Sequence, residues 1–399
     1  MIRKIITIIL LFGLFFGLFM HYQSRWAPKK GFSDYRVYYK AGRDILEGKN
    51  IYKNIDTLEK EGITPFKYSP LFALSMVFLS SFSLNVSASL FFIINIIAIL
   101  LIFRLSKKLI FFQEVSPGKI SLILSVAFIL SFRFILNCLD VGQVGLLILF
   151  LLVLALSFIS QGKKTTGALL IGLSVMIKYM PFLFVFYFLW KKEFKIVAVV
   201  LLSLILYCLL PGIFIGFKTN FFYLKEWLPY IVGNSFSRGT FANTRNYSLW
   251  SLTERLFPSL GSNAMILIIL AMFTVLLFFI LKKHKISTEP KLAGFYNCLD
   301  YGMILLCVAL FNPNAWPHNF VMMVFSYLLT VYYLFICNFK DKVVLVLILA
   351  SFILASGESK SIVGVTIRNI FDNYAPVTIG SLLLFVALIK LKFCRLKCQ

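Results

Sequence analysis

The feature that most constrains this chain is the recurrence of apolar runs close to twenty residues long along most of its length. A helix needs about 20 apolar residues to cross a hydrocarbon layer about 30 Å thick. Apolar residue types make up 60% of the 399 residues and charged types only 14%, which is more apolar surface than a soluble core needs. The sequence therefore predicts an all-α polytopic membrane protein, with residues 1–399 forming a single integral membrane domain.

Hydropathy divides the chain into thirteen apolar segments, and the first is read as an uncleaved helix because no small-residue cleavage site follows it. Two of them, 165–177 and 180–190, are short and flank Pro181, which indicates one broken helix around Lys178. The segments are 5–20, 68–84, 87–106, 118–137, 142–160, 165–177, 180–190, 195–215, 262–281, 297–311, 316–337, 342–356 and 373–392.

The positions of lysine and arginine predict which segments cross the membrane. If all thirteen crossed, the clusters at 104–108 and 163–164 would face outward, against the positive-inside rule. If 68–84 does not cross, every basic cluster falls on the cytoplasmic side. We therefore expect about twelve transmembrane helices, both termini in the cytoplasm, and a re-entrant or surface segment at 68–84. Irregular backbone at membrane depth needs cover from protein or a watery cavity, so a cavity is expected beside that segment.

The net charge of +24 could suggest a nucleic-acid partner, but its distribution argues against one. The basic residues lie at the ends of apolar segments, as membrane anchors do, and form no soluble patch interleaved with aromatic side chains. The cysteines show neither C-x-x-C nor zinc-site spacing. No nucleic-acid partner and no metal site are therefore predicted.

Three long loops fall on the outer face in this topology, at 21–67, 217–261 and 357–372, and helices are expected within them. The first loop carries six of the sixteen acidic residues of the chain. Because acid is scarce elsewhere, this loop is where a catalytic base is expected. The six are Asp34, Asp44, Glu47, Asp56, Glu59 and Glu61.

Asp34 begins the stretch from Ser33 to Gly42, whose aromatic spacing predicts an amphipathic helix on the outer surface. Two interpretations stay open at this point. Asp34 could stabilise the helix start, with Ser33 as the cap, because an acid in the first turn suits the helix dipole. Alternatively, its carboxylate faces a site and acts as a base.

Lys178 lies next to the helix break and is the only cation in the short outer loops. It either reaches back to the membrane interface or binds an anionic group. The Asp140–Gln143 turn, with Gly142 as its pivot, is expected to present Gln143 toward the interior. Arg133, one span earlier, needs a partner at membrane depth, and Asp140 is a candidate.

Two further outer segments are polar. The stretch from Asn312 to Asn319 contains two prolines and His318, and it is either a plain turn or part of a site. Arg245 and Asn246 lie in the second long loop, which is either solvated or functional. An acid, an amide, cations and an imidazole on one face suit a phosphorylated, lipid-tethered substrate. No second carboxylate is clearly placed to share a metal ion with Asp34, so no cofactor is predicted and the metal requirement stays open.

The ordered motifs resemble glycosyltransferase family 87, a branch of the GT-C superfamily that includes polyprenol-phosphate-mannose-dependent mannosyltransferases of bacteria. The resemblance runs from about residue 30 to 320. Two positions depart from the expected pattern, Asn314-Ala315 before the tryptophan and Val144-Gly145 after the glutamine. The motifs are Asp34-x-x-x-Tyr38-Tyr39, Gly48-x-x-x-Tyr52, Tyr68-x-Pro70-Leu71, Gly142-Gln143, Lys178-x-x-Pro181, Asn246-x-Ser248-Leu249 with Arg255, and Trp316-Pro317-His318.

The resemblance implies a GT-C-like fold, a polyprenyl-phosphate sugar donor and an inverting transfer of a hexose, mannose above all, to a lipid or glycan acceptor. It implies a multi-pass protein of the bacterial inner membrane with a periplasmic active site, and it makes Asp34 the catalytic base. Two alternatives stay open, a transporter or flippase of lipid-linked sugars and a protein like the O-antigen ligases. The residues expected to bind the donor phosphate or the acceptor are Lys178, His318, Gln143, Arg245, Asn246, Tyr38 and Tyr68.

Overall fold

The structure, a computed structural model, describes residues 32–52, 64–235, 238–282, 290–357 and 360–393. Within these ranges every regular element is a helix, as the sequence predicts. The predicted first span at 5–20 and three of the six loop acids, Asp56, Glu59 and Glu61, lie outside the described residues. The elements are α2 (Ser33–Leu46), α4 (Pro70–Ser80), α5 (Leu84–Ile110), α6 (Pro117–Val141), α7 (Gly145–Ser160), α8 (Lys164–Ile177), η1 (Met180–Phe182), α9 (Leu183–Trp190), α10 (Phe194–Leu209), α11 (Pro211–Ile215), α12 (Phe217–Ser235), α13 (Arg238–Phe241), α14 (Leu249–Leu256), α15 (Ser262–Leu281), α16 (Pro290–Leu310), η2 (Pro317–Met322), α17 (Met323–Ile336), α18 (Lys342–Ser356), α19 (Lys360–Asn373) and α20 (Pro376–Phe393).

Many of these helices are apolar enough to lie in a membrane. Within the described ranges seven are also long enough to cross one, and five further apolar helices are shorter. These lengths and compositions confirm a polytopic membrane protein, while the number of twelve crossings stays a prediction. The seven spans are Leu84–Ile110, Pro117–Val141, Phe194–Ile215, Ser262–Leu281, Lys291–Leu310, Pro317–Ile336 and Pro376–Phe393.

The segment expected not to cross contains α4, which is only 11 residues long. A helix of that length measures about 16 Å, roughly half of the hydrocarbon thickness. It packs against α2, and Gly42 permits the contact, because a Cβ there would lie 2.2 Å from Ser80 Oγ. Its length is compatible with a segment that does not cross, but Met180–Trp190, which the predicted topology has crossing, is equally short, so the path of 68–84 stays a prediction.

The predicted break at Lys178 is confirmed. α8 ends at Ile177, Lys178 is extended (φ −149°, ψ 123°), and the chain continues through η1 into α9. Lys164 Nζ lies 2.6 Å from Glu193 Oε2, so the start of α8 meets the end of α9. The two helices thus form a hairpin, and Lys178 lies at its apex, about 20 Å from Lys164 along α8.

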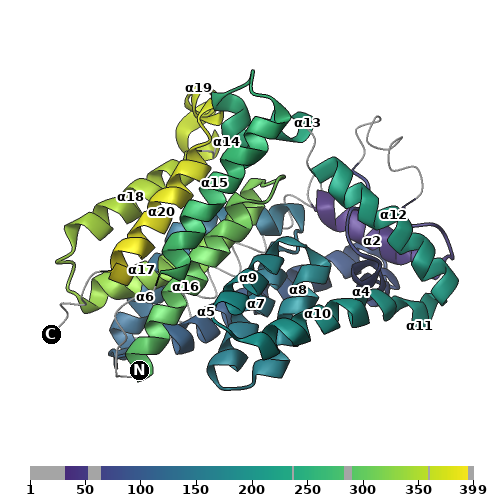
Figure 1. Ribbon diagram of the computed structural model, residues 1–399, viewed down its shortest axis with the longest axis horizontal. Coiled ribbons are helices and arrows are strands. Elements are labelled where there is room, and N and C mark those ends of the chain that lie inside the picture. The colour runs from purple at the N-terminus through teal and green to yellow at the C-terminus, as the bar shows by residue number, and fades with distance from the viewer. Residues whose placement is uncertain (1–31, 53–63, 236–237, 283–289, 358–359, 394–399) are drawn as a thin grey trace.

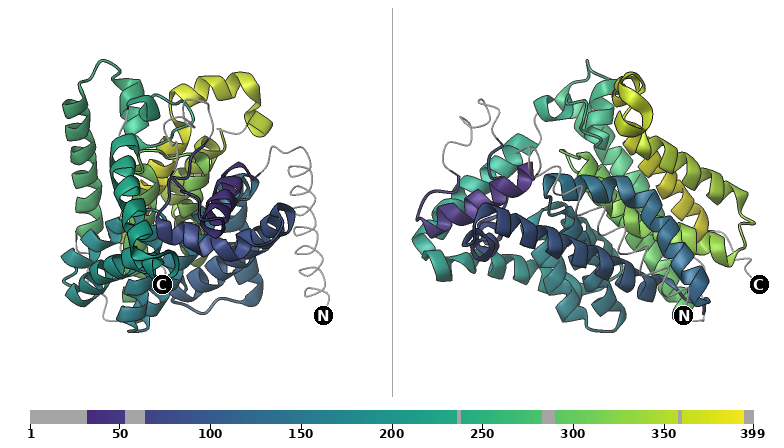
Figure 2. Two further views of the ribbon diagram at one scale, coloured as in Figure 1. Left: turned by 90° about the vertical axis from the view of Figure 1, so that its right-hand side faces the viewer. Right: turned by 180° about the vertical axis from the view of Figure 1, so that it is seen from behind.

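The centre of the bundle is formed by η2 and α17. In the most apolar 18-residue stretch of this span 89% of the residues are buried, against 17% in α15. Away from the apex of the α8–α9 hairpin, Asp300 of α16 binds two cations, Lys191 Nζ at 3.1 Å and Lys392 Nζ at 2.7 Å, and so ties α9 and α20 to α16. At one end of the molecule, α2, α4 and α12 form a separate layer (Figures 1 and 2). The site described next lies between this layer and the bundle.

Candidate active site

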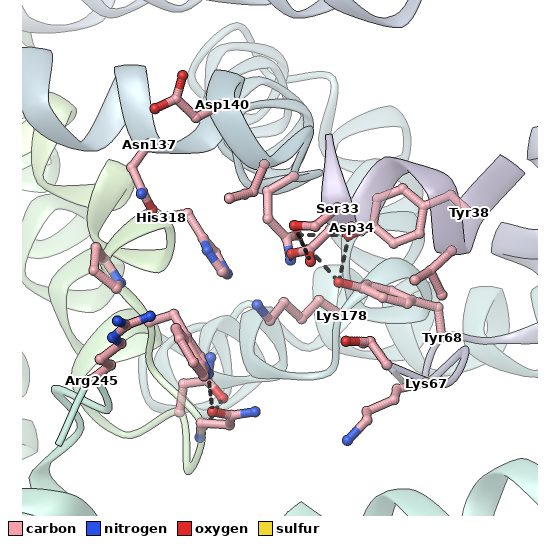
Figure 3. Close-up of a pocket in the computed structure, with 18 of the residues that line it drawn as sticks. Ser33, Asp34, Tyr38, Lys67, Tyr68, Asn137, Asp140, Lys178, Arg245 and His318 are labelled. Carbon is pink, nitrogen blue, oxygen red and sulfur yellow. Dashed lines mark hydrogen bonds between the residues drawn. The ribbon is translucent and has the colours of Figure 1, made fainter. Parts of the chain in front are cut away.

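A cavity of about 1370 Å³ opens where α2, α6, the apex of the α8–α9 hairpin, α12 and the 312–318 loop converge. It collects segments that are far apart in the sequence, from residue 33 to residue 368. Figure 3 shows the central part of its lining. The polar and charged residues that line it include Ser33, Asp34, Tyr38, Lys67, Tyr68, Arg133, Asn137, Asp140, Gln143, Lys178, Arg245, Asn312, Asn314, His318, Ser356 and Arg368.

Asp34 lies in the first turn of α2, as predicted, but its carboxylate does not cap the helix. The residue at the N-cap is Phe32, in the left-handed conformation and without a side-chain cap bond, and its N–H donates to Asp140 O at 2.8 Å. Asp34 Oδ2 instead accepts a hydrogen bond from Gln143 Nε2 at 2.6 Å. Burial raises the pKa of the Asp34 carboxyl above its ordinary 3.8, while the Gln143 hydrogen bond and the Lys178 charge oppose the rise. This carboxylate is therefore a stronger proton acceptor than an exposed one.

The turn that presents Gln143 depends on glycine. Gly142 has φ +67°, a conformation that costs other residues energy. A Cβ at this position would also lie 2.6 Å from Tyr35 Cβ, so no larger residue fits between α6 and α2. The predicted turn geometry of Gly142 and the interior orientation of Gln143 are both confirmed, since Gln143 is 5% exposed.

Two tyrosines converge on the same amide. Tyr38 Oη donates to Gln143 Oε1 at 2.9 Å, and Tyr68 Oη reaches the same oxygen at 3.2 Å. The two hydroxyls are 2.8 Å apart, and burial raises the pKa of both tyrosines, so they stay protonated donors at neutral pH. The network thus brings Asp34, Tyr38, Tyr68 and Gln143 together.

Lys178 faces the same cavity from the apex of the α8–α9 hairpin. Its ammonium donates a short hydrogen bond to Asn319 Oδ1. Burial lowers the pKa of Lys178 to about 8, an effect that Cys138 and Asp34 oppose. Within the described part of the chain, no ion pair joins Lys178 to Asp34, although each charge influences the pKa of the other. The site thus holds two opposite charges that face a shared space.

His318 lies in η2 at the start of the central span, and its ring and the Lys178 ammonium point into the space that Asp34 borders (Figure 3). The loop before it is held by its own asparagine, because Trp316 Nε1 donates to Asn314 Oδ1 at 2.6 Å. This bond gives the unusual Asn314 a local structural role. Arg245 lines the same cavity from the second long loop.

Asn246 is placed differently. It is fully buried and is not among the residues that line the cavity. Its Nδ2 donates to Thr240 O and Pro313 O, and its Oδ1 accepts from the N–H groups of Ser248 and Ala315, so all four positions of the amide are used. Asn246 therefore ties the second loop to the 312–318 loop and has no position left for a substrate.

Several lining residues were not predicted from the sequence, among them Lys67, Arg368 and the two aromatic side chains of α12, Trp227 and Tyr230. Asn319 was also missed, although it directly follows the Trp316-Pro317-His318 motif. Arg133 and Asp140 both line the cavity, and the predicted pairing between them stays a prediction. Within the described ranges no group of three or more histidine, cysteine or acidic side chains is arranged to hold a metal ion.

Two acids in the described part of the first loop, Asp44 and Glu47, face away from the cavity. Glu47 binds Arg43 at 2.9 Å and Lys49 at 2.5 Å, and Asp44 lies 3.9 Å from Lys40. None of these side chains lines the cavity. Of the acids in the described part of this loop, Asp34 is thus the one that the fold brings to the site.

This arrangement offers the half-buried Asp34 carboxylate as a base, the Lys178 ammonium for an anion, and a cavity with polar and apolar walls. Those are the groups that a displacement at a phosphate-activated carbon requires. No curated protein sequence matches the chain. A model of glycosyltransferase family 87 matches residues 66–299, which is 234 of the 399 residues and includes Gln143 and Lys178, while Asp34 and His318 lie outside the matched range. The chain belongs to glycosyltransferase family 87.

Proposed function

We propose that this membrane glycosyltransferase moves a hexose, with mannose as the first candidate, from a polyprenyl-phosphate donor to a hydroxyl group of a lipid or glycan acceptor. The observation that carries the proposal is the pair Asp34 and Lys178, which face one cavity and do not neutralise each other. Family membership supports sugar transfer over the alternatives of a flippase and an O-antigen ligase.

The proposed reaction is a single displacement with inversion. One Asp34 oxygen, Oδ2, is held by Gln143, while Oδ1 has only a long contact of 3.4 Å with Ser33 Oγ. Oδ1 takes the proton of the acceptor hydroxyl as its oxygen attacks the anomeric carbon. The bond from that carbon to the phosphate oxygen breaks, and its electron pair leaves with the polyprenyl phosphate. Phosphate is a good leaving group, so no second carboxylate has to protonate it.

Lys178 is proposed to bind the donor phosphate, with His318 and Arg245 nearby. The phosphate gains negative charge as it leaves, so a fixed cation stabilises the transition state more than the ground state. Burial lowers the pKa of Lys178 to about 8, and a bound phosphate favours the protonated amine. The cation therefore keeps its charge when it is needed.

The apolar part of the cavity wall is where the polyprenyl chain is proposed to lie. Ile129, Phe132 and Leu136 form a stripe along α6 at helical spacing and line the cavity, and Ile129 is 60% exposed. The sequence predicted a cavity beside the 68–84 segment. Of that segment only Tyr68 lines the cavity, so the contacts favour α6.

The cavity is large enough for both substrates. Its volume of about 1370 Å³ exceeds the roughly 300–1,000 Å³ of common small-molecule sites. A single displacement requires donor and acceptor to be bound together, which such a volume permits. We place the protein in the bacterial inner membrane with both termini in the cytoplasm and this cavity on the periplasmic side, because Lys164 and Lys191 lie at the other end of the α8–α9 hairpin.

The test is transfer from polyprenyl-phosphate mannose by the purified protein, followed by the release of polyprenyl phosphate. Asp34→Asn should lower turnover about 10²–10⁴-fold while the protein stays folded, because the amide cannot take the proton. Asp44→Asn is the matched control, since Asp44 lies on the same helix outside the cavity, and should keep turnover. Normal turnover by Asp34→Asn would refute the role of the base, and transport of a labelled lipid without phosphate release would favour a flippase.

A further inference from the structure

Behind each of the two opposed charges lies one buried side-chain amide. Gln143 donates to the carboxylate of Asp34, and Asn319 accepts from the ammonium of Lys178. Both amides are neutral, so they can hold an ion in place without cancelling its charge. Gln143 is 5% and Asn319 is 6% exposed, which leaves little of either amide for a substrate.

The orientation of the Gln143 amide is fixed by a backbone N–H, which can only donate to it. Its Oε1 accepts from Val144 N–H at 3.0 Å and from the hydroxyls of Tyr38 and Tyr68. A backbone N–H cannot accept a hydrogen bond, so the oxygen must face this side and Nε2 must face Asp34. Gln143 therefore always presents a donor to the carboxylate.

The Asn319 amide is oriented by a backbone carbonyl, which can only accept a hydrogen bond from it. Its Nδ2 donates to the backbone carbonyl of Asn314 at 3.1 Å, and a carbonyl can only accept. The backbone N–H of Asn319 donates to Trp316 O at 2.8 Å, so the backbone of this residue is held as well. Oδ1 must then face Lys178, and it presents an acceptor to the ammonium.

We propose that Gln143 and Asn319 are positioning residues that keep the Asp34 carboxylate and the Lys178 ammonium from forming an ion pair across the cavity. Opposite charges in a partly desolvated space attract strongly. If they met, the base and the phosphate site would be lost together. The inference rests on the proposed function, because it concerns the two groups to which that function assigns the chemistry.

Other charged groups line the same cavity, namely Lys67, Arg133, Asp140, Arg245 and Arg368. Tyr38 of α2 and Tyr68 face Asp34, while Cys138 of α6 and His318 of η2 face Lys178. No carboxylate other than Asp34 is among the charges that influence the pKa of Lys178. Asp34 and Lys178 are the opposite charges that influence each other's pKa, so each is the expected ion partner of the other if an amide is lost.

The inference gives an unusual pH signature. In Gln143→Met or Asn319→Leu, the freed charges pair, which lowers the pKa of Asp34 and raises that of Lys178. The pH profile of kcat/KM should widen by about 1 unit at each limb, while its plateau falls about 100-fold. The double variant should be no slower than the slower single variant, because both lead to the same ion pair.

A chemical readout tests the pairing without turnover. A water-soluble carbodiimide joins a carboxylate to an amine in contact with it, with loss of water to the reagent, and mass spectrometry identifies the joined peptides. The Asp34–Lys178 link should be absent from the wild type and present in both variants. Gln161→Leu is the matched control, because Gln161 binds Ser157 O far from the cavity, and it should change neither readout.

The outcomes separate clearly. The inference would be overturned if both limbs of the kcat/KM profile stayed at their wild-type pH, or if only the acid limb moved, to higher pH. It would also be overturned if the two substitutions had multiplicative effects on kcat/KM, or if no Asp34–Lys178 link formed. If a single variant fails to fold, Tyr38→Phe with Tyr68→Phe removes two of the three donors to Gln143 Oε1 and should give the same link. If Asp34→Asn retains turnover, the proposed function fails, while the cross-linking contrast still tests the positioning.

Discussion

Asn246 should be one of the most stabilising polar side chains in the molecule, although it touches no substrate in the proposed reaction. Asn246→Ala removes four buried hydrogen bonds, with donor–acceptor distances of 2.7 to 3.1 Å. A hydrogen bond contributes about 1 kcal/mol net, and an orphaned buried donor costs about 1–3 kcal/mol. The change orphans the N–H groups of Ser248 and Ala315, so the free energy of unfolding should fall by about 3–5 kcal/mol.

The measurement is an unfolding titration of the purified protein in detergent micelles, followed by tryptophan fluorescence. Asn243→Ala is the matched control on the same loop, because Asn243 is exposed and its side chain accepts a single bond, from Arg245 N–H at 2.9 Å. It should cost less than about 1 kcal/mol. Equal effects of the two substitutions would refute the idea that Asn246 ties the loops together. A folded Asn246→Ala protein should also show a raised KM for the donor, because the tied loop carries His318.

The remaining predictions concern pH and topology. For the wild type, kcat/KM should fall as the pH drops through the raised pKa of Asp34, because Asp34 must be ionised to act as a base. It should fall again as the pH rises through about 8, because Lys178 then loses its charge. The alkaline limb of kcat should lie higher than that of kcat/KM, because bound phosphate stabilises the ammonium; coincident limbs would argue against a phosphate at Lys178. In a background without native cysteines, a cysteine at Asn85 should react with a membrane-impermeant reagent from outside, and one at Gln161 from the cytoplasm, and the reverse pattern would refute the topology.

Much of this fold could be predicted because the signals are local. Apolar length predicted the spans, and Pro181 with the flanking short segments predicted the break at Lys178. The aromatic spacing from Ser33 to Gly42 predicted an amphipathic helix, and α2 is such a helix, with a buried face that packs on α4. Such patterns follow from helix geometry within a few turns, so they need no knowledge of partners.

The site was predicted less completely, because its members are joined by contacts across the fold. The sequence could place Gln143 in a turn, but its bond to Asp34 joins residues 109 positions apart. For Asn246 too, the partner could not be predicted from the sequence. Its motif suggested a substrate contact, whereas its amide binds the backbone groups of Pro313 and Ala315. Polar residue types indicate where hydrogen bonds are needed, and the partner is known only once the helices are packed.

The charge rule predicts that 68–84 does not cross, and the shortness of α4 is compatible with that prediction, although Met180–Trp190, which the same topology has crossing, is equally short. The rule removed the 68–84 segment from the crossings because two basic clusters would otherwise face outward. The structure gives a helix of 11 residues there, too short for the hydrocarbon by about half. The hairpin of α8 and α9 adds a third argument, since the contact between Lys164 and Glu193 puts the basic end of both helices opposite Lys178. If the basic end is cytoplasmic, as the charge rule predicts, then we expect Lys178, and with it Asp34 and the cavity, toward the outer side, where the proposed lipid-linked donor would be bound.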